Sequence, residues 1–139
     1  MHRKFALLLT LGLAFLGGWS LRAQSGSRVA IVYYWKAKLG KLDAYNQYIQ
    51  TIATPIDEDA RRHNAYISLT TFISRKPDGP WTHMRVFVLK DREQAANLAR
   101  ALDEAGARVQ PDETKRKANQ ELSATLRDFV AEEDLDILE

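Results

Sequence analysis

The residues best suited to chemistry lie on one predicted strand, WTHMRVFVLK, at 81–90. His83 and Arg85 are two residues apart, so their side chains share one face of that strand. Histidine can exchange a proton near neutral pH, and arginine can hold a carboxylate or enolate oxygen. A histidine and an arginine bracketed by aromatic residues are unusual in a plain core. We therefore predict His83 and Arg85 as candidate catalytic residues, facing away from the helices.

Neighbouring residues extend this pair into a candidate ligand site. We expect residues 66–74 to form the preceding strand and to bring a matching face beside the pair across a hairpin. Apolar pockets with a few convergent polar groups are typical of small-ligand sites. The predicted ligand-binding residues are Tyr66, Ser68, Thr70, Phe72, Trp81, Phe87 and Trp35. In the alternative interpretation, His83 and Arg85 hydrogen-bond or form ion pairs across a dimer interface and do no chemistry.

Other reactive groups are scarce. The chain has no cysteine, which excludes disulfides, thiol nucleophiles and thiolate metal sites. His2, His63 and His83 lack metal-ligand spacing, so we expect no metal site. The sequence also lacks a G-x-G-x-x-G, a phosphate loop, a G-x-S-x-G and an H-E-x-x-H. These absences disfavour nucleotide-binding enzymes, common serine hydrolases and zinc proteases, and we expect no cofactor.

The elements that position these residues follow from composition and periodicity. Residues 28–38 are rich in Val, Ile, Tyr and Trp, which favours a largely buried strand. Ordinary strand packing is the alternative role for Trp35. Apolar residues at three- and four-residue steps then predict a helix that starts near Leu42 and ends near Asn64. Pro55 is expected to kink or split it, with Thr54 capping the restarted part.

A hairpin and a second helix follow. Residues 66–74 alternate between two faces, and the turn signal Pro-Asp-Gly-Pro at 77–80 leads into the strand at 81–90. Asp91 begins a capping-box pattern. Gly106 is the expected end of this helix.

The C-terminal part is predicted to be a third, charged helix capped by Asp112. We expect the acidic tail from Glu132 to be solvated, its last apolar residues forming a short strand or a docked helical end. The order of elements predicts an α+β fold, a ferredoxin-like antiparallel sheet with helices on one face and an extra C-terminal helix. The apolar stripe of that last helix comprises Ala118, Leu122, Leu126 and Phe129.

These elements resemble the dimeric α/β-barrel superfamily, which includes antibiotic-biosynthesis-monooxygenase-like domains. The resemblance lies in the strand VAIVYYWKAK, the turn at 39–41 into a Tyr-containing helix and the strand WTHMRVFVLKD, and it covers roughly residues 28–105. It implies two sheets that face each other across a homodimer and enclose a pocket. Members range from cofactor-free oxygenases, isomerases and haem-degrading enzymes to proteins of unknown role. The usual last strand of the superfamily is not evident, because a charged helix occupies its place.

Residues 1–24 are predicted to be an export signal. A basic start at 1–4 precedes an apolar run at 5–16, and the small residues Ala23 and Ser25 suit cleavage. The apolar run is short for a membrane span, although an uncleaved anchor remains the alternative. We expect a periplasmic or secreted product whose residues 25–139 form a single domain.

Removal of the signal changes the charge of the chain. Arg3, Lys4 and Arg22 leave and no acid does, so 20 basic and 18 acidic residues become 17 and 18. A near-neutral domain without a basic block is a poor candidate for nucleic-acid binding. Once the signal is cleaved, we expect no membrane association either.

The leading hypothesis is an exported homodimeric barrel protein that binds a small apolar or anionic molecule. Cofactor-free monooxygenase or isomerase chemistry is the activity that the resemblance implies, and the residues themselves leave open whether the protein is an enzyme. The competing hypothesis is a non-catalytic envelope protein whose aromatic sheet face serves only dimerisation.

Overall fold

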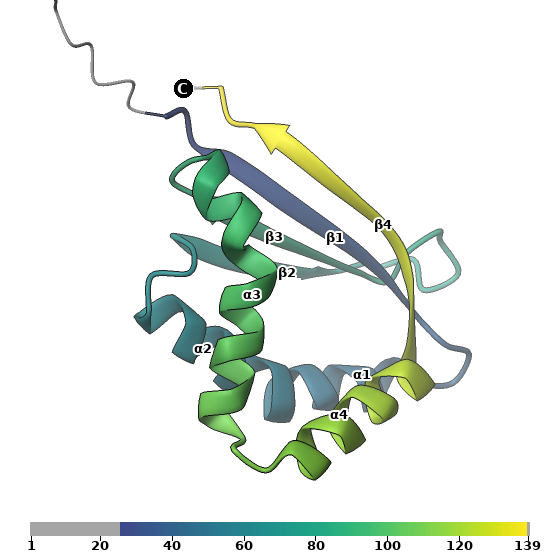
Figure 1. Ribbon diagram of the computed structural model, residues 1–139. Helices are drawn as coiled ribbons and strands as arrows, with labels where there is room; N and C mark the ends of the chain where they lie inside the picture. Colours follow the sequence, from purple (N-terminus) through teal and green to yellow (C-terminus); the bar gives the residue numbers. More distant parts are fainter. Residues whose placement is uncertain (1–25, 139) are drawn as a thin grey trace, which may run out of the picture.

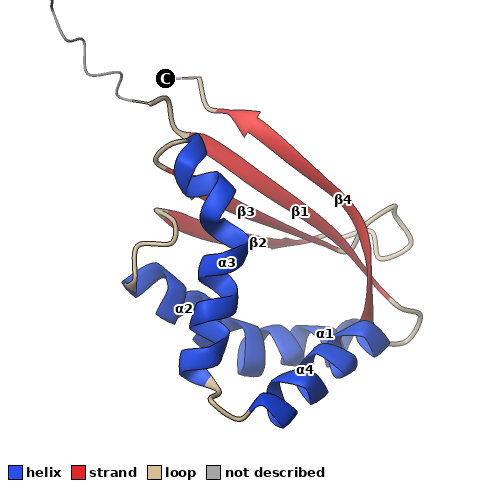
Figure 2. Ribbon diagram, viewed as in Figure 1, coloured by secondary structure: helices blue, strands red, loops and turns tan. Residues whose placement is uncertain are grey.

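The sheet is antiparallel and four-stranded, in the order β2-β3-β1-β4, and the helices lie on one of its faces (Figure 1 and Figure 2). The computed structural model describes residues 26–138, so the predicted export signal lies outside the described residues. Within them, no helix combines the length and apolar character needed to cross a membrane. The predicted α+β, ferredoxin-like architecture is confirmed.

Three of the four strands match the predicted segments closely, because each is a short run rich in residues that fit a pleated surface. The strands are β1 Val29–Ala37, β2 Ser68–Ile73, β3 His83–Leu89 and β4 Arg127–Asp136. The helices are α1 Leu42–Tyr48, the π-helical turn η1 Ile49–Ala53, α2 Thr54–Arg62, α3 Arg92–Val109 and α4 Glu113–Leu126.

The interruption expected at Pro55 takes the form of the π-helical turn η1 rather than a break. Proline has no backbone N–H, so one ordinary helical hydrogen bond cannot form there. The Thr54 hydroxyl donates to the carbonyl oxygen of Ile49 at 2.9 Å. The prediction that Thr54 caps a restarted helix was therefore wrong, since helical backbone runs on from α1 to α2.

Both later helices begin as predicted. The Asp91 carboxylate accepts the backbone N–H of Gln94 at 2.7 Å, and that of Asp112 accepts the N–H of Lys115 at 3.1 Å. The predicted stop at Gly106 was wrong. The residue is buried within α3, which packs against α2 and continues to Val109.

The last strand, β4, corrects the sequence interpretation of the C-terminus. The third helix ends at Leu126, and Phe129 lies in β4 rather than on a helical stripe. β4 pairs with β1 along its whole length, with a register irregularity at Tyr34/Trp35. It is an edge strand, and edge strands commonly carry charged side chains that prevent pairing with other chains. Because β4 carries the charges of an edge strand, its acidic sequence was interpreted as a solvated tail.

The core lies between the sheet and the helices. Its main cluster joins residues of β1 and β3 to α2 and α3, and a smaller cluster joins the end of β1 to α1 and α4. The buried residues of the main cluster are Val29, Ile31, Ala60, Ala65, Tyr66, Phe87, Leu89, Leu98 and Ala105. Those of the smaller cluster are Ala37, Tyr45 and Leu126.

Candidate functional site

The odd-numbered residues of β3 face the helices, which reverses the predicted orientation. His83 is completely buried and bonds to α1, Arg85 bonds to α2, and Phe87 is 1% exposed within the main core cluster. The prediction that this pair projects away from the helices was wrong. The opposite, open face of β3 instead carries Met84, Val86 and Val88.

His83 is held by neutral partners on both ring nitrogens. Nδ1 lies 2.9 Å from the Thr82 hydroxyl and Nε2 lies 2.8 Å from Oδ1 of Asn46 on α1. The Tyr45 ring packs edge-on with its centroid 4.4 Å away. Burial, together with the nearby positive charges of Arg127 and Arg85, lowers the pKa of His83 to about 4. The imidazole is therefore neutral at neutral pH, and its contacts favour a structural role.

Arg85 is paired with a buried carboxylate. Its guanidinium donates to Asp57 of α2, and both side chains are nearly nine-tenths buried. Burial raises the pKa of Asp57, while the positive charge of Arg85 opposes that rise. The Tyr66 hydroxyl donates to the Asp57 backbone carbonyl and so closes the cluster. Because its charge is already matched, Arg85 is not free to hold an anionic ligand. The catalytic role predicted for His83 and Arg85 stays a prediction.

The predicted ligand-binding residues do not converge on one site. Tyr66 and Phe87 are core residues whose rings meet edge-on at 5.0 Å. Trp81 packs near the ring of Tyr34, which belongs to the open face. Trp35 faces the helices, beside His83 in the sheet. The remaining three, Ser68, Thr70 and Phe72, pair with Val88, Val86 and Met84 and therefore lie on the open face, so the expected matching face was wrong for them.

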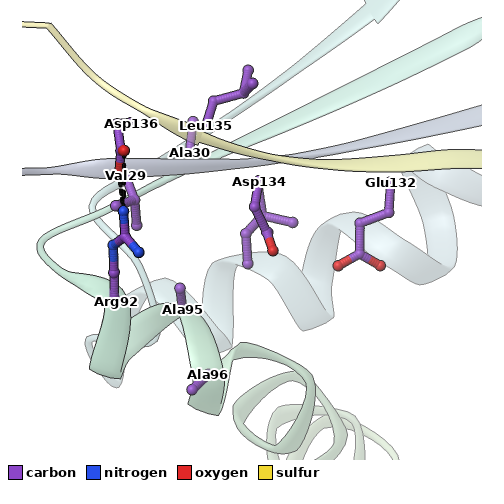
Figure 3. A pocket seen from close by; sticks show the side chains of 10 residues that line it. Val29, Ala30, Arg92, Ala95, Ala96, Glu132, Asp134, Leu135 and Asp136 are labelled. Atoms are coloured by element: carbon purple, nitrogen blue, oxygen red, sulfur yellow. Dashed lines mark hydrogen bonds and ion pairs between the residues drawn. The ribbon is translucent and has the colours of Figure 1, made fainter.

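An open groove of about 460 Å³ runs between β4 and α3. Val29 and Ile31 of β1, together with Ala95 of α3, give it apolar walls. Figure 3 shows the side chains of Glu132 and Asp134 pointing from β4 toward the helices.

One end of the groove is closed by an ion pair. Arg92 Nη2 lies 2.9 and 3.0 Å from the two carboxylate oxygens of Asp136, a contact that Figure 3 also shows. In contrast, neither Glu132 nor Asp134 forms an ion pair with any residue in 26–138. Two carboxylates thus face an apolar surface without a matching cation among the described residues.

Tyr33 lies next to these carboxylates. It pairs with Glu132 on one side and with Arg85 on the other, so the three residues form one row across the helix-facing side of the sheet. Burial raises the pKa of the Tyr33 phenol, and the negative charges of Glu132 and Asp134 raise it further. Tyr33 is therefore a protonated hydrogen-bond donor at neutral pH, beside two potential proton acceptors.

Sequence analysis missed Glu132 and Asp134 because it treated the acidic tail as solvated. A usable signal was present: Glu132, Asp134 and Asp136 recur every second residue, which is the period of a strand with one acidic face. Within residues 26–138, no cluster of three or more His, Asp or Glu side chains is arranged to hold a metal ion.

Comparison with known proteins bears on the fold. No family model matches the sequence, and no curated protein matches it. HapK from Hahella chejuensis aligns with a TM-score of 0.52 at 12% identity, over 79% of this chain and 92% of HapK. SnoaB, a cofactor-independent oxygenase from Streptomyces nogalater, aligns with a TM-score of 0.51 at 11% identity, over 82% of this chain and 96% of SnoaB.

A NIPSNAP family protein of unknown function from Agrobacterium tumefaciens aligns with a TM-score of 0.48 at 17% identity, over 81% of this chain and 87% of that protein. The structural matches to HapK and SnoaB show that this chain shares their fold, and so support the predicted ferredoxin-like architecture. The β2-β3-β1-β4 sheet, including the last strand, has the ferredoxin-like strand order.

Proposed function

We propose that the protein binds a small, hydroxylated apolar molecule in the groove between β4 and α3 and removes a proton from it. One observation carries this proposal: Glu132 and Asp134 face an apolar surface without a cationic partner among the described residues. Carboxylates accept hydrogen bonds from hydroxyl groups and can act as general bases when they are within reach of the proton. Their negative charge disfavours anionic ligands at this groove.

Tyr33 supplies the complementary group. A protonated phenol beside the carboxylates can donate a hydrogen bond to the oxygen anion left when a substrate hydroxyl or an adjacent carbon loses its proton. In this proposal the two groups act on the same substrate from neighbouring strands, Glu132 from β4 at the groove and Tyr33 from the paired position on β1 beside it. His83 and Arg85, on the same side of the sheet, attach β3 to the helices through Asn46 and Asp57.

The reaction that we propose to test first is cofactor-free oxygenation. SnoaB, which shares the fold, is described as a cofactor-independent oxygenase. In such a reaction the protein removes the proton, and the resulting anion supplies the electrons to molecular oxygen. An isomerase would begin with the same proton removal and return the proton at another atom. Fold alone does not assign a reaction, so the proposal rests on the groove.

We propose further that the protein is a homodimer that pairs through the open face of the sheet. No helix covers this face in the described residues (Figure 2), and Phe72 and Leu135 are each 46% exposed on it. Contiguous apolar patches of this kind commonly mark interaction surfaces. Light scattering should give twice the monomer mass, and Val86→Lys should give the monomer mass because it places an unpaired charge at the centre of the face. A wild-type monomer would contradict the dimer.

Export remains a proposal of the sequence alone. We propose that cleavage falls within residues 23–26 and gives a periplasmic or secreted protein. Mass spectrometry of the protein from its native envelope or medium should find the shortened N-terminus, and a membrane-bound product that retains Met1 would contradict it.

The experiment for the groove compares two changes on one strand. The double variant Glu132→Gln with Asp134→Asn is compared with the wild type. Its melting-temperature increase with 2-naphthol and related hydroxylated arenes, and its rate of oxygen uptake with them, should both be much smaller. Glu133→Gln is the matched control, because Glu133 lies on the open face and bonds to Tyr34. Equal losses in both variants would refute the groove. Absence of any ligand effect in the wild-type protein would favour the non-catalytic alternative.

A further inference from the structure

A second groove lies at the foot of α4, on the helix side of the sheet and separate from the β4–α3 groove. Its volume is about 460 Å³, and it is bounded by Trp35 of β1, Tyr48 of α1, Phe129 of β4 and one side of α4. Phe129 is 55% exposed, so a large aromatic surface is left uncovered there. Its ring meets Trp35 edge-on at 5.2 Å, which makes the two rings one continuous wall.

The groove also contains an arginine that has no counter-ion in the described part of the chain. Arg127, the first residue of β4, donates from Nε to the Ser123 hydroxyl at 2.9 Å and from Nη1 to the Tyr45 hydroxyl at 2.6 Å. Its guanidinium carbon lies 3.5 Å from the centroid of the Trp35 ring. All these partners are neutral, and within residues 26–138 Arg127 forms no ion pair. In the sheet interior, by contrast, Arg85 has Asp57.

This arrangement fixes the guanidinium in position without using its charge. Nε and one Nη1 hydrogen are bonded, and stacking on Trp35 holds the plane of the group, so Nη2 remains available to an acceptor. Asp128 also borders the groove, but its carboxylate pairs with Lys38 at 3.6 Å. A planar anion would therefore meet a fixed cation and an aromatic wall at the same place.

We propose that this groove is a binding site for a small aromatic monocarboxylate, with the carboxylate on Arg127 and the ring against Trp35 and Phe129. The site differs from the β4–α3 groove in the sign of its charge, so this groove selects an anionic ring and the β4–α3 groove a neutral, hydroxylated ring of similar size. The same strand carries both: Arg127 and Phe129 at its start, Glu132 and Asp134 further along.

The test uses 2-naphthoate and 2-naphthol, which share a ring system and differ in charge. Calorimetric titration of 2-naphthoate into the purified protein should show saturable binding that weakens with added salt. Arg127→Met should weaken it about tenfold or more, because the charge-assisted hydrogen bonds are lost. Arg100→Met is the matched control: it removes the same charge from an exposed site on α3 that pairs with Glu104. Affinity equal to wild type in Arg127→Met would overturn the proposal.

A second variant keeps the test decisive if Arg127→Met does not fold. Phe129→Ala removes an exposed ring, so the fold should persist while 2-naphthoate binding weakens several-fold. The Trp35 indole N–H resonance should shift on addition of 2-naphthoate and not on addition of 2-naphthol. Unchanged affinity in Phe129→Ala, or a Trp35 shift with 2-naphthol alone, would contradict the site. Loss of 2-naphthol binding in the Glu132/Asp134 variant bears only on the β4–α3 groove, so the two proposals fail separately.

Discussion

Strands β3 and β4 both present charged residues to the same helix-facing side of the sheet, but these residues differ in burial and in ion pairing. On β3, Arg85 is nearly buried and its charge is matched by Asp57. On β4, Glu132 and Asp134 are exposed and have no cationic partner in the described residues. Matched, buried polar groups mainly hold a structure in place, whereas unmatched groups beside an apolar surface are available to a ligand. The comparison locates the proposed chemistry on β4.

The largest expected effect concerns the buried pair of β3. Asp57→Ala leaves the Arg85 charge in the interior without a partner, which should lower the free energy of unfolding by about 3–5 kcal/mol. The double change Asp57→Leu with Arg85→Met replaces the pair by apolar groups and should recover most of that loss. Urea unfolding of the variants measures both values. A loss below about 1 kcal/mol in Asp57→Ala would show that the pair is not structural.

The pH dependence of stability tests His83. Its pKa is about 4 in the folded protein against 6.5 for an unperturbed histidine, so the unfolded state binds more protons between these values. This contribution to stability is complete above pH 6.5 and is lost as the pH falls toward 4. Between pH 7 and pH 5 the unfolding free energy should fall by about 2 kcal/mol more in the wild type than in His83→Gln.

Comparison with His83→Gln is needed because Asp57 acts in the opposite direction. The pKa of Asp57 is raised by burial, so protonation of Asp57 favours the folded state as the pH falls. Both proteins retain Asp57, and its contribution cancels in the difference. Parallel pH profiles for the wild type and His83→Gln would contradict a neutral, buried His83.

The smallest expected effect concerns the acidic residues of β4. Glu132→Gln and Asp134→Asn should each change the unfolding free energy by no more than about 0.5 kcal/mol, because both side chains are exposed and unpaired in the described structure. Urea unfolding at neutral pH checks this value. A loss above about 1 kcal/mol would mean that the β4 acids are structural like the β3 pair.

Sequence reasoning recovered the elements that depend on local signals. β1 follows from its β-branched and aromatic run, and the starts of α3 and α4 follow from Asp91 and Asp112, whose carboxylates cap nearby backbone N–H groups. The ferredoxin-like fold was also predictable, because the order of strands and helices is shared with HapK and SnoaB although few residues are identical.

The site depended on contacts between distant residues, which local patterns do not reveal. His83 and Arg85 can be buried under the helices because they bond to Asn46 and Asp57. These partners lie 37 and 28 residues earlier in the chain, so no local pattern connects them. We predicted that the apolar face of β3, with Val86 and Val88, packs under the helices. The sequence shows that these two residues share a face, but it does not show which face of the strand the helices cover. β4 was hidden because edge-strand charges resemble a solvated tail.

The central claim is that the ligand binds on the β4 side of the sheet and not at His83 and Arg85. Amide chemical shifts measured during titration with 2-naphthol test this claim most directly. The account predicts that the shifts concentrate at Val29–Ile31, at Ala95 and Ala96 and at Glu132–Asp136, which surround the β4–α3 groove. Shifts concentrated instead at Ser68, Thr70 and Phe72 on the open face, or at His83, would contradict it.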